Sequence, residues 1–384
     1  MNGSVVMTSD EAAALGARLA RAQLVAACPD LRRSGPLRAI AGSGDSGMRF
    51  IESTSQRQAM ATLIGAAQAG ARVFTAAASQ SLAHAHEMMF WAAQARLPVV
   101  MANPSHPLGP GLNFGSDASD CAAQRDCGWV QIFCESAQEV LDSVILAYRV
   151  AYASSLPVMV SYDASTLSNS YEPVNAPEEG AVSAFVGAGE MSLVLGEGEP
   201  RSFGPETDSN SYAQFRRAME EALDAARLAF DKAASDFAGK FGRGYASVEP
   251  VFTKGSDLAL VASGSMAGTA RAAVDRMRRR GELAGLIKMR MLRPFPRESL
   301  VDAVFARRGS PTIKRLAVLD RNAGHGADGV WSQEIRAALS DKDQAPRVIC
   351  VRAGLGRRDV GAEEIERAYD EARASGDDLR TIWL

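Results

Sequence analysis

Short apolar runs alternate with helix-length segments along most of the chain, and this alternation restricts the possible folds more than any other feature. From residue 71 the runs are apolar throughout, which is typical of strands buried on both faces of a parallel sheet. The expected strands cover 71–76, 98–102, 129–134 and 157–162, and the expected helices between them cover 80–96 and 138–153. The pattern therefore predicts an α/β domain with helices on both faces of the sheet.

The same alternation returns after residue 257. Expected strands cover 258–264, 286–291, 316–321 and 347–352, and expected helices cover 267–279, 297–305, 329–339 and 362–374. Between the two blocks, residues 164–210 are rich in Ser, Gly, Pro and acidic residues and are predicted to form an extended connector. A long amphipathic helix is expected over 212–241, with one apolar face formed by Phe215, Met219, Leu223, Ala226 and Phe230. We therefore divide the chain into domains at 1–163 and 255–384, joined by a connector and helix at 164–254.

Charge and hydropathy exclude two classes of partner. The 384 residues carry 42 basic and 45 acidic side chains, a formal charge of −3 that is mixed in sign along the chain, so no nucleic-acid surface is indicated. No uncharged apolar run reaches the ~18 residues that a membrane span needs. The first 23 residues resemble an amphipathic helix with acids at Asp10 and Glu11, unlike a secretory signal. A cytoplasmic protein is expected.

The cysteines argue against disulfides and clusters. There are five, and no two are separated by only two residues: Cys28, Cys121, Cys127, Cys134 and Cys350. We expect reduced thiols and no metal or iron–sulfur ligand set on this chain. If the protein handles electrons, another chain must carry them.

Two glycine motifs suggest anion binding. Residues 42–47 match G-x-G-x-x-G, but MRFIES follows where a dinucleotide site needs a helix, so a loop is favoured and a nicotinamide enzyme is the weakest hypothesis. Residues 264–269 do lie between an expected strand and an expected helix. Their amides can hold an anion, and a tight turn capped by Ser265 explains the pattern equally well.

Histidines and one long loop are the remaining candidates. His84, His86 and Glu87 lack the H-E-x-x-H spacing of zinc proteases, so structural histidines are favoured. His325 follows an expected strand, where either a ligand or loop hydrogen bonds would explain it. The segment 103–124 is the most suggestive, because long loops in compact domains are often functional and this one contains His106, Asn113, Asp117 and Asp120. From these residues alone we expect a crevice at a strand end, with no nameable reaction.

Several long segments, in order along nearly the whole chain, resemble the alpha subunits of the 2-oxoacid:ferredoxin oxidoreductases, the pyruvate and 2-ketoisovalerate synthases. The segments are IGAAQAGARVFTAAASQSLAHAHEMMFWAAQARLPVVMA, SDCAAQRDCGWVQIF, LPVMVSYDASTLSNSYEPV, DLALVASGSMAGTARAAVDRMR, KMRMLRPFP, AVLDRNAGHG and GLGRRDV. The resemblance implies a domain of the type that contacts the pyrimidine ring of thiamine diphosphate, followed by an α/β domain like the C-terminal domain of transketolase.

The family's division of labour agrees with what this chain lacks. A beta-type subunit binds the diphosphate and Mg²⁺ through a G-D-G…N motif, and no G-D-G occurs here. Iron–sulfur clusters and the ferredoxin contact lie on further chains, in some complexes gamma- and delta-type subunits. The implied reaction is oxidative decarboxylation of a 2-oxoacid, with electrons passing to a ferredoxin-type acceptor and the acyl group to coenzyme A.

The resemblance implies pocket residues at which this sequence departs from the family. The Thr of the family's Y-P-I-T-P turn falls on Leu31, in Cys28-Pro29-Asp30-Leu31-Arg32, and the Glu that bonds the pyrimidine nitrogen falls on Gln56. The Arg that binds the substrate carboxylate falls on His106, and the His of D-H-x-D falls on Ala118. We expect Gln56 and His106 at the catalytic position, Gln56 and Asn113 at the cofactor, and Leu31, Arg32 and His106 in the substrate pocket.

These departures leave two main hypotheses. In the first, the chain is the alpha subunit of an active 2-oxoacid oxidoreductase with an altered substrate pocket. Glu52 would then replace the lost glutamate if a two-residue insertion shifts the alignment, and Arg32, Arg33 or Arg57 would bind a substrate anion unless they are solvated surface charges. In the second, the chain is a non-catalytic structural or regulatory subunit that keeps the fold and the interface.

Overall fold

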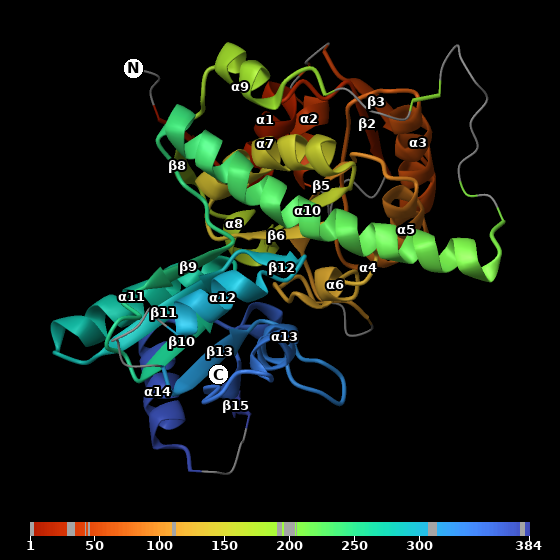
Figure 1. The fold of residues 1–384 in the computed structure, drawn as a ribbon. Helices are drawn as coiled ribbons and strands as arrows, with labels where there is room; N and C mark the ends of the chain where they lie inside the picture. Colours follow the sequence, from red (N-terminus) through yellow and green to blue (C-terminus); the bar gives the residue numbers. More distant parts are fainter. Residues whose placement is uncertain are drawn as a thin grey trace.

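A computed structural model describes residues 4–28, 35–42, 44, 47–109, 113–189, 194–195, 204, 206–305, 313–376 and 381–384. The chain forms two main sheets, one above the other in Figure 1. Within the described residues the first sheet has seven strands, in the order β12 (Met291–Arg293), β6 (Val130–Cys134), β7 (Val158–Asp163), β5 (Val100–Ser105), β4 (Val73–Ala76), β2 (Leu24–Ala27) and β3 (Arg49–Glu52). All are parallel to their neighbours except β12, which is antiparallel to β6.

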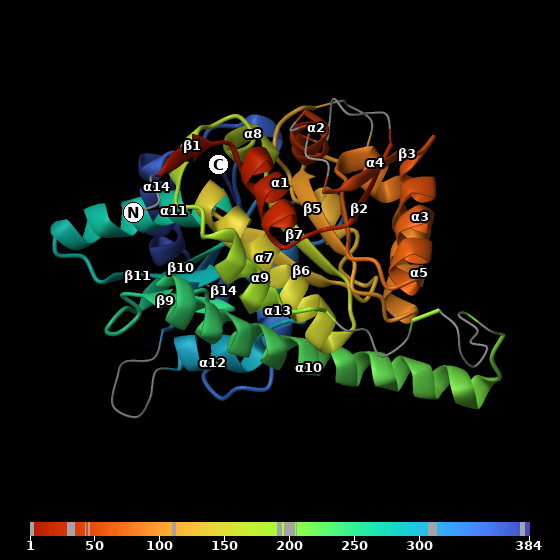
Figure 2. The same ribbon diagram turned by 90° about the horizontal axis from the view of Figure 1, so that it is seen from above.

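Two groups of helices cover the first sheet (Figure 2). On one face α1 (Ser9–Leu19) contacts α2 (Gly35–Gly42) and α7 (Ala137–Ser154). On the other, α3 (Gln56–Gln68) contacts α4 (Ser79–His84) and α5 (His86–Gln94). The expected single helix at 80–96 is wrong in one respect, since it breaks at Ala85. No Gly or Pro stands there, so the pattern could not indicate the break.

The second sheet confirms the second α/β block. Among the described residues it has six strands, in the order β15 (Ile382–Trp383), β14 (Arg347–Arg352), β13 (Arg315–Asp320), β10 (Leu258–Ala262), β11 (Ala284–Met289) and β9 (Val248–Val251). Only β9 is antiparallel to its neighbour. The surrounding helices are α11 (Ser265–Arg279), α12 (Arg297–Val304), α13 (Val330–Leu339), α14 (Ala362–Ala374) and a 3-10 turn, η1 (Leu355–Arg357).

The two sheets share one apolar core. Side chains of β10, β11, β13, α12 and α13 belong to the same buried cluster as the first sheet, while α11 and α14 bury a separate cluster on the far face. Phe133 of β6 meets Trp331 of α13 edge to face, with ring centroids 5.4 Å apart. The second block is therefore packed directly against the first.

One expected strand turns out to be two. The apolar run at 286–291 was expected in a single sheet, but β11 ends at Met289 and β12 begins at Met291 in the other sheet. Arg290 lies between them. Its N–H donates to Ser247 O at 3.0 Å, beside β9, and its carbonyl accepts from Phe133 N at 2.7 Å, on β6. Periodicity could not predict this crossing, because both halves are equally apolar.

The connector contains more structure than expected. Residues 164–189 include α8 (Ala164–Leu167), β8 (Glu172–Val174) and α9 (Glu179–Val186). Strand β8 pairs antiparallel with β1 (Val5–Met7), more than 160 residues away in sequence. The prediction of an extended connector is wrong here, because a strand that pairs only with the N-terminus leaves no local periodicity. A short helix, α6 (Ser119–Ala122), completes the elements.

The long helix is present as α10 (Ser209–Phe241), which lies across α7 (Figure 1). Asp208 caps its first turn, and Gly242, at φ 73°, ends it in the left-handed conformation that glycine allows. Met219, Ala226 and Phe230 are buried as expected. Phe215 is 54% exposed, so the predicted apolar face is only partly covered within the described chain.

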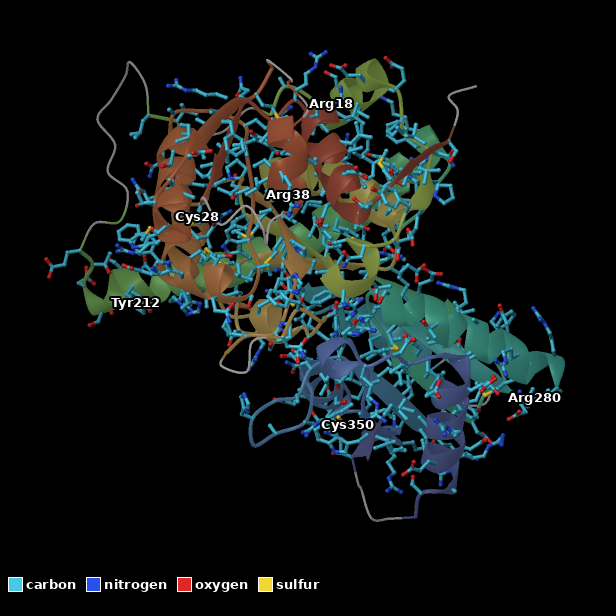
Figure 3. All side chains as sticks on the ribbon, turned by 180° about the vertical axis from the view of Figure 1, so that it is seen from behind. Arg18, Cys28, Arg38, Tyr212, Arg280 and Cys350 are labelled. Carbon is cyan, nitrogen blue, oxygen red and sulfur yellow. The ribbon has the colours of Figure 1, made fainter. Side chains whose placement is uncertain are left out.

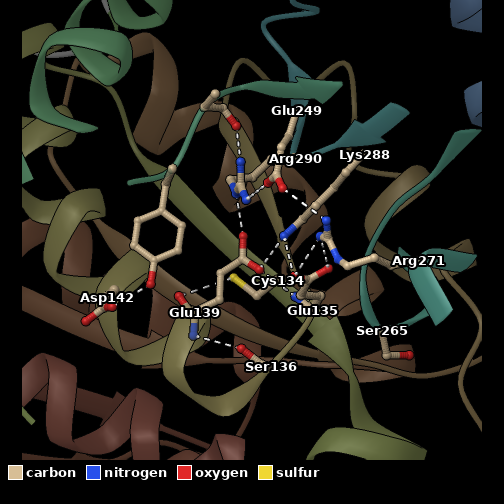
Figure 4. A network of polar contacts seen from close by, with 12 residues as sticks. Cys134, Glu135, Ser136, Glu139, Asp142, Glu249, Ser265, Arg271, Lys288 and Arg290 are labelled. Carbon is tan, nitrogen blue, oxygen red and sulfur yellow. Dashed lines mark hydrogen bonds and ion pairs between the residues drawn. The ribbon is translucent and has the colours of Figure 1, made fainter. Parts of the chain in front are cut away.

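A buried ion network joins the two sheets at the crossing (Figure 4). Glu139 of α7 is almost fully buried between Lys288 Nζ, at 2.7 Å, and Arg290 Nε. Burial alone raises the pKa of Glu139, but attraction to Arg290 and Lys288 outweighs it and lowers the pKa to about 2. Glu135 and Glu249 extend the network to Arg290 and Arg271. Three carboxylates are thereby balanced by three cations.

Replacing Glu139 with Gln is expected to destabilise the protein strongly, by about 3–5 kcal/mol, because two buried cations lose their main partner. The matched control is Glu221→Gln, which breaks the exposed 3.0 Å pair with Arg217 and is expected to cost less than ~1 kcal/mol. Urea unfolding at neutral pH measures both values. Equal, small losses would contradict the role given to the network.

The same residue predicts a pH dependence. The pKa of Glu139 is lowered from 4.5 to about 2 on folding, so its stabilisation is complete above its unfolded pKa and is lost as the pH falls through the window from 4.5 to 2. The unfolding free energy of the parent chain is expected to fall more steeply across this window than that of Glu139→Gln. Parallel curves would show that Glu139 does not titrate in this way.

Candidate functional site

A buried carboxylate organises the loop that follows β5. Asp120 is fully buried, and burial raises its pKa although several donors converge on it. The donors are Ser79 N (2.8 Å), Asn103 Nδ2 (3.2 Å), Ser105 Oγ (2.7 Å), His106 N (3.2 Å) and Cys121 N (2.7 Å). The loop is thus bound at both of its ends, and His106 is held where β5 stops.

A cavity of about 870 Å³ opens at this carboxyl edge of the first sheet. Pro104 and His106 border it from β5, and Ala164 borders it just after β7. Ligands of open parallel sheets bind at this edge. The polar wall is contributed by α1, α2, the segment after α8 and the second block, through Asp10, Arg38, Ser168, Tyr171 and Arg357. In Figure 3, Arg38 of α2 lies in the same half of the molecule as Cys28, the residue that directly follows β2.

Asp10 is an acid of the cavity wall that is held by two hydroxyl groups. Its Oδ1 accepts from Tyr162 Oη at 2.7 Å and from Ser168 Oγ at 2.9 Å. Burial raises the pKa of Asp10, while the two hydroxyl donors and the charge of Arg38 act in the opposite direction. A cavity carboxyl group with a raised pKa is suited to hold a proton near a bound ligand.

His106 faces the same cavity in a defined orientation. Its Nδ1 lies 2.9 Å from Gly115 O, and because a carbonyl oxygen only accepts, Nδ1 must carry the proton. In the neutral ring, Nε2 is therefore a hydrogen-bond acceptor.

Gln56 lies at the point where the strand order reverses. It begins α3 after the Ser55 cap, is 2% exposed, and its Nε2 donates to Thr75 Oγ1 at 3.4 Å. Thr75, on β4, donates in turn to Ala26 O on the neighbouring β2 at 2.8 Å. The connections from β2 and β4 run to opposite sides, through α2 and through α4 and α5. Open α/β sheets bind ligands at such a switch point.

The second block closes one side of this region. Asn113 Nδ2 donates to Gly356 O at 3.2 Å, and Gly356 N donates to Ser116 O at 3.2 Å. The turn at 264–269 does hold an anion, which is the chain's own Asp163: Ser265 N donates to Asp163 Oδ2 at 2.7 Å, and Arg321 pairs with its Oδ1 at 3.0 Å. That motif therefore joins the two blocks.

The weaker motifs have structural explanations. His84 and His325 are exposed, and His86 Nδ1 lies 2.6 Å from Gln124 Oε1. Glu87 pairs with Arg57 at 2.9 Å. Strand β3, and not a helix, follows residues 42–47, which removes the context of a dinucleotide site. Ser43, Asp45 and Ser46 of the expected loop lie outside the described residues. Over the described ranges we find no cluster of three or more His, Cys, Asp or Glu side chains that suits a metal ion, and no helix that could span a membrane. All five cysteines are free thiols.

Two family models cover most of the chain. Residues 37–235 match the pyruvate flavodoxin/ferredoxin oxidoreductase, thiamine diphosphate-binding model, and residues 256–365 match pyruvate:ferredoxin oxidoreductase core domain II. Pyruvate synthase subunit PorA of Methanothermobacter thermautotrophicus is 36% identical over 99% of this chain and 97% of its own length. The chain belongs to this family. Ketoisovalerate oxidoreductase subunit VorA of Pyrococcus horikoshii is 34% identical, over 96% and 93% of the two chains.

Solved structures of lower identity share the fold. A 2-oxoglutarate:ferredoxin oxidoreductase from Magnetococcus marinus, solved with 2-oxoglutarate, coenzyme A and succinyl-CoA bound, superposes with a TM-score of 0.72 at 19% identity, over 97% of this chain. This chain spans 65% of that longer chain. A split-gene transketolase gives 0.53 at 16% identity, over 95% of this chain and 96% of its own. The predicted two-part α/β fold is thereby confirmed.

The structure places some of the predicted pocket residues near the cavity and others away from it. Gln56 and His106 both lie at the carboxyl edge of the sheet, although only His106 borders the cavity. Asn113 contacts the second block, and Leu31 and Arg32 lie outside the described residues. Glu52 ends β3 and is exposed, unlike the buried Gln56.

Sequence reasoning gave no role in the pocket to three of the lining side chains. Asp10 lies between Thr8 and Glu11, which form a capping box. An acid at this position is expected at the start of a helix, so its sequence context does not indicate a site residue. Arg38 follows a segment without clear periodicity. Arg357 is about 250 residues away from His106 in sequence, and no local pattern could connect the two.

Asp120→Ala is expected to release the loop that carries His106, because five donors lose their acceptor. We expect a loss of about 3 kcal/mol or more in unfolding free energy, together with faster amide exchange across 103–109 and 113–124. Asp343→Ala, on the exposed surface, serves as the control and should change neither. Unchanged exchange in a folded Asp120→Ala protein would show that the loop is held by other contacts.

Proposed function

We propose that this chain is the alpha-type subunit of a thiamine-diphosphate-dependent 2-oxoacid oxidoreductase with an altered substrate pocket. With a beta-type subunit it would carry out the oxidative decarboxylation of a 2-oxoacid, passing electrons to a ferredoxin-type acceptor and the acyl group to coenzyme A. The observation that carries this proposal is the cavity at the carboxyl edge, which residues matched by both family models line together.

The buried amide of Gln56 fits a bound pyrimidine ring. When present, thiamine diphosphate supplies the carbanion-stabilising chemistry of decarboxylation. Gln56 offers a neutral amide at the carboxyl ends of β2 and β4, and an amide cannot exchange a proton there as a carboxyl group does. We infer that Gln56 positions the ring without taking part in proton transfer. The Mg²⁺ site and the iron–sulfur clusters are assigned to partner chains.

The part of the pocket that we propose to be altered is the cavity wall formed by His106 and Asp10. His106 borders the cavity, and its Nδ1 donates to Gly115 O. Asp10, whose pKa is raised by burial, adds a carboxyl group to this wall that accepts from Tyr162 and Ser168. We infer a pocket that binds its substrate with a different set of polar groups from that of the relatives.

Co-expression with a beta-type chain carrying G-D-G…N tests the proposal. We expect a stable complex that binds thiamine diphosphate and, with at least one of pyruvate, 2-ketoisovalerate and 2-oxoglutarate, reduces ferredoxin or a viologen dye. A complex that binds the cofactor and turns over none of these acids would favour the second hypothesis, a non-catalytic structural subunit.

The double reversion Gln56→Glu with His106→Arg separates the two hypotheses. If the native complex is active with its altered pocket, the reversion should lower that activity by roughly 10²–10⁴-fold, because both side chains would be mismatched to the native substrate. If the native complex is inactive, the reversion should create activity with pyruvate. The parent complex and each single reversion are assayed alongside, at equal cofactor occupancy.

A further inference from the structure

Arg357, in the turn before α14, contributes a positive charge to the cavity wall. It borders the cavity with Asp10, Arg38 and His106, and it is exposed. Throughout the described part of the chain, no hydrogen bond or ion pair engages its guanidinium group. A guanidinium group presented to a cavity in this way is suited to bind an anion.

The acids of the cavity do not supply that anion. Asp10 is already engaged by Tyr162 and Ser168 and lies within reach of the charge of Arg38. Glu11 accepts hydrogen bonds from Thr8 in the capping box of α1. His106 is held by Gly115 as a donor at Nδ1 and adds no permanent charge. Among the residues that the structure describes, the positive charge of Arg357 is therefore left for a ligand.

The backbone holds Arg357 in an unusual conformation. Its φ is 74°, in the left-handed region that residues other than glycine seldom adopt. Gly356, just before it, has a φ of 63°. Strain of this kind persists only where surrounding contacts impose it, and it is concentrated at binding sites.

The contact that imposes this conformation on Arg357 is made by Gly115, in the loop after β5. A Cβ added to Gly115 would lie 2.3 Å from both Arg357 N and Gly356 C, so only glycine lets the two segments approach this closely. Ser116 O accepts from Gly356 N at 3.2 Å. Gly115 also accepts from His106, so one glycine positions both His106 and Arg357.

We propose that Arg357 binds the carboxylate of the 2-oxoacid and so completes the substrate pocket from the second block. The inference rests on the proposed function, since it names the group that recognises the substrate of that same site. A guanidinium group can hold a carboxylate through two parallel N–H···O bonds, which the His106 imidazole cannot do.

The experiment compares Arg357→Ala and Arg357→Lys with Arg358→Ala in the assembled complex. Arg358 is the exposed neighbour of equal charge that does not border the cavity. We expect Arg357→Ala to raise KM for the 2-oxoacid by about 10–100-fold with little change in kcat, because a charge-assisted contact made in ground and transition states alike is lost. Lys should recover part of the loss, and Arg358→Ala should behave as the parent.

Coenzyme A is also anionic, so its KM is measured on the same variants. An unchanged KM for coenzyme A supports the assignment, whereas a rise confined to coenzyme A would overturn it. The assignment also fails if Arg357→Ala leaves the 2-oxoacid KM within twofold of the parent, or if Arg358→Ala raises it equally.

Gly115→Ala tests the positioning of Arg357 independently. It should raise the 2-oxoacid KM in the same direction, and the double variant with Arg357→Ala should be little worse than Arg357→Ala alone. Fully additive effects would contradict the coupling. If the parent complex turns over no 2-oxoacid, titration calorimetry with pyruvate and 2-oxoglutarate still decides: weaker binding by Arg357→Ala alone supports Arg357 as the carboxylate site while turnover fails. Absence of any binding by the parent complex overturns both proposals.

Discussion

The buried ion network around Glu139 is the contact on which the arrangement of the two sheets depends. Lys288 and Arg290 lie where the chain passes from the second sheet into the first. Both pair with the carboxylate of Glu139 on α7. An unpaired charge at this depth would be costly, so alternative dockings of the two blocks that separate these groups are strongly disfavoured. The contact of Phe133 with Trp331 buries apolar surface but does little to fix the orientation of one block relative to the other.

The pocket follows from that docking. Once the second block is seated, the Gly354–Arg357 turn reaches the loop after β5 and places Arg357 beside His106 in a common cavity. Asp120 fixes the loop from the first block, and Gly115 allows the turn to approach from the second. Neither block alone contains the whole polar wall, so changes at the interface are expected to act on substrate binding.

Much of the fold could be predicted because its signals are local. Continuously apolar strands such as β5, β7 and β13 indicate a sheet that is covered on both faces. The segments of α7, α11 and α14 show clear helical periodicity. The elements that were missed or misjudged depend on distant partners. Strand β8 forms because β1 is available to it, and the run at 286–291 divides because Arg290 bonds to one sheet on each side.

The sequence by itself determined the fold class and the family, since these are properties of residue type and order. It also led us to propose Gln56 and His106 as departures from the family. Only the tertiary structure decided which side chains share a cavity. Asp10, Arg38 and Arg357 come from three distant segments, and nothing in their local sequences relates them. The physical reason is that a pocket is an arrangement of surfaces. Its charge and shape are set when separately folded segments pack, and by contacts such as that of Gly115 with the turn before Arg357.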